Sequence, residues 1–131
     1  MFITQINTGE RPVHWVAAAT AISWLGEYIH NRIELPGLSV FSPENSVLAI
    51  VAAALFLLWW LVPARRFPSI LLIGLALLHF FGGAILSVIP FSFLPFYPEQ
   101  TFRHYLAHLL YGLAQLPLIL LLVRSRLERQ L

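Results

Sequence analysis

Five ionisable side chains lie in or beside apolar stretches where a plain membrane anchor would not need them: Glu27, His30, His79, His104 and His108. Glu27 and His30 are three positions apart and His104 and His108 four apart, so each pair shares a helix face. A Glu-x-x-His pair on one helix and a His-x-x-x-His pair on another are ligand sets with which helical bundles bind divalent metals. Imidazole and carboxylate suit zinc, iron or copper. These patterns predict a metal site whose ligands are Glu27, His30, His104 and His108. The alternative is that Glu27, His30 and His104 lie close enough to the membrane interface to be solvated or to bind lipid headgroups.

His79 differs from the other histidines because it lies near the middle of its apolar stretch. A polar group at that depth usually faces protein and has a partner or a function. Two interpretations remain open. The imidazole is either bonded to a backbone carbonyl or hydroxyl and holds helices together, or it binds a cofactor, such as a quinone or pigment, beside Phe80 and Phe81. Haem ligation by His79 is disfavoured, because no second histidine lies at the same depth.

Composition indicates which elements carry these residues. Hydrophobic residues make up 59% of the 131-residue chain and charged residues 11%, against about 25% charged in a typical soluble domain. A bilayer core requires about 20 apolar residues per helix. We therefore predict an all-α, polytopic membrane protein, with a single membrane domain (1–131) and four transmembrane helices in a small bundle. The predicted spans are approximately 12–29, 46–62, 68–89 and 102–123, with a broken loop at 31–45 and an aromatic, Pro-rich segment at 90–98.

The arginines predict the orientation of the bundle. Six of them fall on one side of a four-span arrangement, and only Arg32 and Arg103 fall on the other. Positive charge favours the cytoplasmic side, so both termini are predicted to be cytoplasmic, in a bacterial inner membrane. The Glu27/His30 and His104/His108 pairs then lie near the outward end. No cleaved signal peptide is expected, because no small-residue cleavage site closes the first apolar run.

Several kinds of chemistry are excluded or disfavoured by composition. The chain has no cysteine, which excludes disulfides and thiolate metal sites. It has no Asp and no G-x-S-x-G motif, which disfavours a hydrolytic triad. The arginines flank apolar runs, which indicates membrane topology and not a nucleic-acid partner. Enzymatic activity is left open by these observations, although they favour a protein that is not an enzyme.

The last two predicted spans contain a series of motifs: Leu78-His79, Gly82-Gly83, Pro90 and the run RHYLAHLLYGLAQLPLILLLVR. This half of the chain resembles the YjdF-like family of small bacterial inner-membrane proteins and, more loosely, the VanZ-like family. The resemblance equates His108 with a histidine of the family pattern, whereas His104 stands where the family has Asp. It implies a multi-pass membrane protein and assigns no biochemical activity.

Three functions follow from these patterns. The first is a non-catalytic accessory or scaffold subunit of a larger membrane assembly, whose partners are the lipid bilayer and other membrane protein subunits. The second is a metal-binding membrane protein with a His/Glu site at the outward ends of the first and fourth spans, its cofactor a divalent transition metal. The third is a quinone- or pigment-binding subunit that uses His79.

Overall fold

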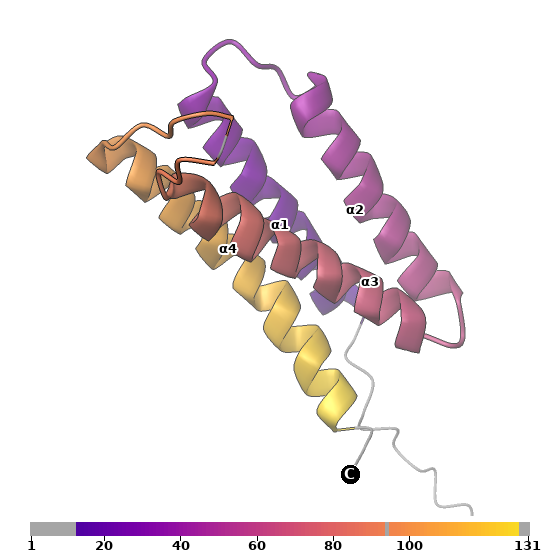
Figure 1. The fold of residues 1–131 in the computed structure, drawn as a ribbon. Helices are drawn as coiled ribbons and strands as arrows, with labels where there is room; N and C mark the ends of the chain where they lie inside the picture. The colour runs from indigo at the N-terminus through magenta and orange to yellow at the C-terminus, as the bar shows by residue number, and fades with distance from the viewer. Residues whose placement is uncertain (1–12, 94, 129–131) are drawn as a thin grey trace, which may run out of the picture.

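A computed structural model describes residues 13–93 and 95–128, and all regular structure in them is helical (Figure 1). The prediction of an all-α chain is confirmed. In chain order, the elements are α1 (Val13–Glu34), α2 (Pro43–Leu61), α3 (Arg66–Leu77), η1 (Leu78–Ile85), η2 (Leu86–Val88) and α4 (Phe102–Leu127). The π-helix η1 and the 3₁₀ turn η2 continue directly from α3, so α3, η1 and η2 form one rod.

The rods run alternately up and down the bundle. Segment 35–42 and the described residues of segment 89–101 lie at one end, which we call the long-loop end, and the short turn 62–65 lies at the other (Figure 1). α1 packs mainly against α4, and α4 also contacts α3 and η1. The second halves of α1 and of the α3–η1 rod therefore meet the first half of α4 near the long-loop end.

In the part of the chain that the structure describes, three helices are long and apolar enough to cross a membrane: Pro43–Leu61, Arg66–Val88 and Phe102–Leu127. This identifies a membrane protein. α1 is not one of these three helices, although its 22 residues have sufficient length. The second half of α1 carries Glu27, His30, Arg32 and Glu34, and these residues lower its hydropathy.

The ends of the helices differ from the predicted ones mainly at the first loop. We predicted a loop from 31 to 45, but α1 continues to Glu34 and ends before Pro36-Gly37. A proline disfavours helical conformation in the residue before it, and Gly37 has a φ of 103°, which suits glycine. α2 begins at Pro43, inside the predicted loop, with Ser42 as its N-cap residue. The predicted start of the first span at Pro12, and the arginines Arg11 and Arg129, lie outside the described residues.

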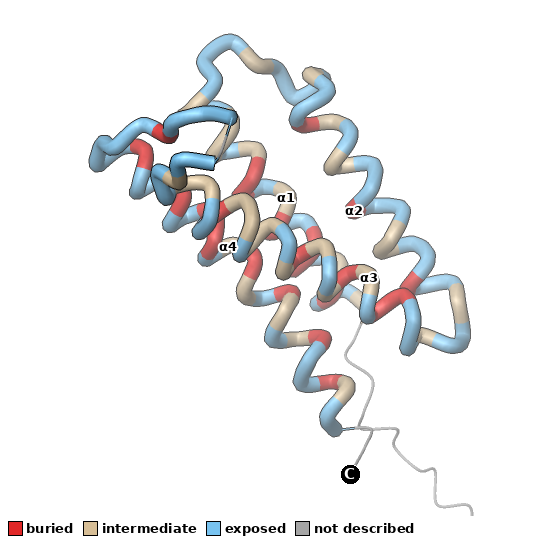
Figure 2. Tube along the Cα trace, in the orientation of Figure 1, coloured by how far each residue is buried: buried red, intermediate tan, exposed pale blue. Residues whose placement is uncertain are grey.

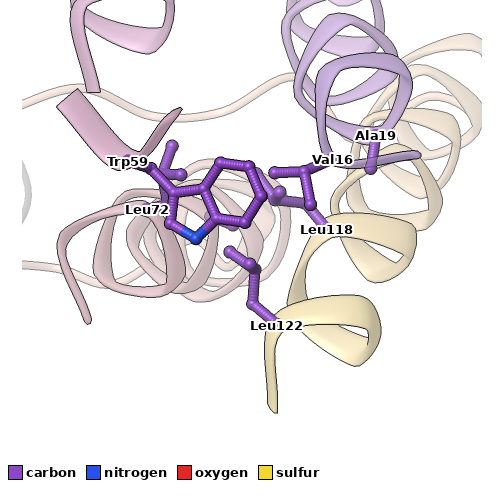
Figure 3. Packing of buried hydrophobic residues seen from close by; sticks show 7 residues of the cluster. Val16, Ala19, Trp59, Leu72, Leu118 and Leu122 are labelled. Carbon is purple, nitrogen blue, oxygen red and sulfur yellow. The ribbon is translucent and has the colours of Figure 1, made fainter. Parts of the chain in front are cut away.

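The half of the bundle near the 62–65 turn holds an apolar core. Trp59 of α2 lies against α1, α3 and α4 there, among the following buried side chains: Val16, Ala19, Leu72, Ala76, Leu118 and Leu122 (Figure 3). The indole Nε1 of Trp59 donates a hydrogen bond to Ser69 Oγ at 3.1 Å. The Arg65 guanidinium lies 4.8 Å from the centre of the Trp59 ring, a cation–π contact. The Trp59 indole thus has a hydrogen-bond partner at Nε1 and a cation–π partner over its ring.

α1 and α4 approach each other closely at a glycine. A Cβ added to Gly26 would lie 2.3 Å from the Cβ of Ala114, so only glycine permits this crossing. One turn away, the buried Gln115 side chain donates from Nε2 to the Ser23 carbonyl at 3.1 Å, and its Oε1 accepts a hydrogen bond from the Ser23 hydroxyl. Buried positions follow α1 and α4 along this contact, whereas most of α2 is exposed (Figure 2).

Candidate metal centre

A pocket of about 360 Å³, with many polar side chains in its lining, lies at the long-loop end between α1, η1 and α4. Phe96 and Pro98 of the 89–101 segment form part of its wall. Gln100 holds that segment in place, because its Nε2 donates to the carbonyls of Val88 (3.2 Å) and Pro98 (3.0 Å). The pocket is lined by most of the predicted site residues and by several others: Glu27, His30, Asn31, Glu34, Gly83, Ser87, His104, His108 and Tyr111.

The centre of the site is a contact between two imidazoles. Nε2 of His30 on α1 lies 3.0 Å from Nε2 of His108 on α4. The two ring centroids are 4.3 Å apart, in an edge-to-face arrangement. His108 is buried, with 5% of its surface exposed. Two residues that are 78 positions apart in the chain are thus brought together by the α1–α4 contact.

The position of the proton on His108 follows from its other nitrogen. His108 Nδ1 lies 2.9 Å from the carbonyl oxygen of Gly83. A carbonyl only accepts, so Nδ1 carries the hydrogen and donates it. Ser87 Oγ lies 3.3 Å from the same nitrogen and itself donates to the Gly83 carbonyl. In the neutral ring, Nε2 of His108 therefore has a free lone pair that faces His30.

The side chains of Asn45 and Asn31 indicate where the proton lies on His30. Asn45 Nδ2 donates to the Ser39 carbonyl at 2.7 Å, so Asn45 Oδ1 is the atom that accepts from Asn31 Nδ2 at 3.0 Å. Asn31 Oδ1 then faces His30 Nδ1 at 3.1 Å and accepts its hydrogen. The Nε2 of a neutral His30 is therefore also unprotonated. In the neutral rings two lone pairs face each other, and a proton or a metal ion between them would relieve their repulsion.

The third histidine of the pocket shows the same pattern. His104 Nδ1 lies 2.6 Å from Glu34 Oε2, so it donates to the carboxylate. Its Nε2 is buried and has no hydrogen-bond partner among the described residues. The rings of His104 and His108 have centroids 4.4 Å apart. The helix start holds His104 in place, because its backbone N–H donates to the Thr101 side chain that caps α4.

Each imidazole thus donates from Nδ1 to an oxygen, which leaves Nε2 available. This is the usual arrangement of histidine metal ligands, in which the bond to the second nitrogen fixes the tautomer and the ring orientation. Metal–nitrogen bonds of 2.0–2.1 Å place two ligands of a tetrahedral ion roughly 3.3 Å apart. The His30–His108 separation of 3.0 Å is close to that value.

Glu27 and His79 form a second, deeper polar group. His79 Nδ1 lies 2.8 Å from the Tyr111 hydroxyl and 3.7 Å from Glu27 Oε2. Glu27 Oε2 is buried without a hydrogen-bond partner, although Glu27 also lines the pocket. The Tyr111 ring connects the two groups, since its centroid lies 5.1 Å from that of His30 and 5.9 Å from that of His79. The structure therefore brings His30, His104 and His108 together and pairs Glu27 with His79.

The π-helical turn η1 shapes one wall of the pocket. The backbone carbonyls of a π-helix point in other directions than those of an α-helix. Such turns often occur at functional sites. Here it presents the Gly83 carbonyl to His108. A Cβ on Gly83 would lie 2.7 Å from Tyr111 Cε1, so glycine is required where η1 meets α4.

The sequence prediction missed Asn31, Glu34 and the Gly83 carbonyl. A signal for the first two was present, because Glu27, His30, Asn31 and Glu34 follow the spacing of one helix face. It was missed because the loop was predicted to begin at residue 31. No residue type could have indicated the Gly83 carbonyl, since a backbone acceptor at that point depends on the π-helical turn.

Comparison with protein-family models, curated proteins and solved structures found no match to this chain. The resemblance to YjdF-like proteins therefore stays a prediction.

Proposed function

We propose that this chain is a four-span membrane protein that binds a divalent transition metal through the Nε2 atoms of His30 and His108. The observation that carries the proposal is the His30–His108 contact, in which the two Nε2 atoms lie 3.0 Å apart while each Nδ1 faces an oxygen acceptor. A metal ion that accepts both lone pairs turns this repulsion into two bonds. In this proposal α1 is the first of the four spans, and its polar half faces α4 and not the lipid.

Three further features support a resident ion. The pocket contains buried polar atoms without partners, His104 Nε2 and Glu34 Oε1, which a ligated ion or its water would satisfy. The Nδ1 acceptors Asn31, Glu34 and Gly83 belong to the surrounding shell that orients metal ligands. The apolar core around Trp59 closes the bundle on the opposite side, which favours a bound ion over passage of ions through the chain.

The test is metal binding by the full chain, purified in mild detergent after treatment with a chelator. We expect Zn²⁺ to bind and His108→Ala to lower the affinity more than the roughly 10–100-fold that loss of an outer-shell partner costs. His14→Ala is the matched control, since His14 is exposed and lies at the opposite end of α1. A proton shared between His30 and His108 would also relieve their repulsion, and in that case wild type and His108→Ala would bind Zn²⁺ equally weakly.

The other two predicted functions are not specifically favoured by the geometry. The exposed apolar faces of α2 and α4 suit lipid as well as a protein partner, so the accessory-subunit hypothesis stays a prediction. The quinone or pigment hypothesis also stays a prediction. His79 Nδ1 is occupied by the Tyr111 hydroxyl, which matches the interpretation of an imidazole that holds helices together.

A further inference from the structure

We infer that the mouth of the pocket holds a second cation position, formed by Glu34, Glu99 and His104. One ligand atom from each of these residues lies within 4.8 Å of the others. The three side chains differ in exposure: that of Glu99 is 51% exposed, whereas those of Glu34 and His104 are 13% and 9% exposed. It therefore extends from the protein surface to the wall of the pocket.

The bonding of the buried members indicates a ligand. Glu34 uses Oε2 to accept from His104, but its Oε1 is buried and has no hydrogen-bond partner. His104 Nε2 is also buried without a partner, and the residue is 7% exposed. A buried carboxylate oxygen without a partner is costly, and a divalent ion would satisfy it. Glu99, just before α4, is held only loosely by Arg103, since Arg103 Nη2 lies 3.8 Å from Glu99 Oε2.

The two positions differ in chemistry. The mouth offers two carboxylates and one imidazole, whereas the inner position offers the imidazoles of His30 and His108. Oxygen-rich sets bind many divalent ions and exchange them readily, while imidazole favours zinc, copper, nickel and iron. The mouth position thus acts as a capture site for a divalent ion that then moves to the inner one. The destination rests on the proposed function, but the mouth position itself does not.

Equilibrium dialysis against Zn²⁺ counts the ions bound per chain. We expect two ions for wild type, one for Glu99→Gln and one for His108→Ala. Glu44→Gln is the matched control, since Glu44 is an exposed carboxylate at the start of α2, and it should keep two.

The outcomes separate the two claims. If wild type binds one ion, which His108→Ala removes and Glu99→Gln leaves unchanged, the mouth position is refuted and the inner site stands. If Glu99→Gln removes an ion and His108→Ala removes none, the mouth position stands and the proposed function fails. If wild type binds no Zn²⁺, both are refuted.

Discussion

The two halves of this bundle are held together by different means. Near the 62–65 turn, the helices meet through Trp59 and a set of buried aliphatic side chains. Near the long-loop end, the same helices meet through imidazoles, carboxylates and amides. In lipid, apolar packing gains little from the hydrophobic effect, so close fit and hydrogen bonds provide most of the association. The apolar half needs only a close fit between its side chains. The polar half also needs a partner for every buried hydrogen-bond donor and acceptor.

This contrast supports the proposal that the metal site lies in the polar half. The apolar half is complete as it stands, because the polar atom of its central residue, Trp59 Nε1, has a partner in Ser69. Among the described residues, the polar half leaves three buried atoms without a hydrogen-bond partner: Glu27 Oε2, Glu34 Oε1 and His104 Nε2. A protein that needed only a stable bundle would not require such a pocket.

The largest expected effect is on metal binding in the polar half. Replacement of His30 by alanine should lower the Zn²⁺ affinity by more than about 100-fold, because it removes one of the two facing nitrogens. The stability of the chain without metal should change little. Dialysis and a denaturant titration of the same preparation measure both quantities. A loss of stability without a loss of affinity would contradict the division between the halves.

In the apolar half, Leu72→Ala should act in the opposite way. Leu72 is fully buried, and truncation of such a residue costs roughly 2–5 kcal/mol in soluble proteins, part of which is the cavity term that also applies in lipid. The free energy of unfolding should fall while Zn²⁺ affinity is kept. Leu120→Ala, on a residue 64% exposed, is the control and should have little effect.

Two neighbouring glycines of η1 test whether the contact between η1 and Tyr111 of α4 positions His108. Gly83→Ala should displace Tyr111 and the carbonyl that orients His108, because the new Cβ would lie 2.7 Å from the Tyr111 ring. We expect Zn²⁺ affinity to fall about 10–100-fold, as for the loss of an outer-shell partner. Gly82→Ala is the matched control, since the nearest atom to its new Cβ is Leu78 Cδ1 at 3.6 Å. Equal affinities for the two variants would show that the Gly83 contact does not position His108.

The smallest effect is expected at the deeper polar group. Tyr111→Phe removes the hydroxyl that bonds to His79 at 2.8 Å but keeps the ring beside His30. Hydrogen bonds between membrane helices average about 0.6 kcal/mol, so the free energy of unfolding should fall by roughly that amount. Zn²⁺ affinity should stay within about threefold of wild type, less than the tenfold that corresponds to 1.4 kcal/mol. A larger fall in affinity would place Tyr111 in the metal centre itself.

The helices could be predicted from the sequence, but the way in which they meet could not. Apolar runs predicted 46–62 and 102–123, and the structure has Pro43–Leu61 and Phe102–Leu127. The meeting of α1 and α4 depends on the fit of Gly26 against Ala114, which no hydropathy pattern reveals. Helix spacing correctly placed Glu27 and His30 on one face, but it could not show that Glu27 pairs with His79.

The most direct test of the central claim is X-ray absorption spectroscopy of the Zn²⁺-loaded chain. We predict a first shell of nitrogen and oxygen at about 2.0–2.1 Å, with the outer-shell scattering of at least two imidazoles. His30→Ala and His108→Ala should each remove one imidazole from that signal. An all-oxygen shell, or a spectrum that neither substitution changes, would contradict the proposal that these two nitrogens bind the metal.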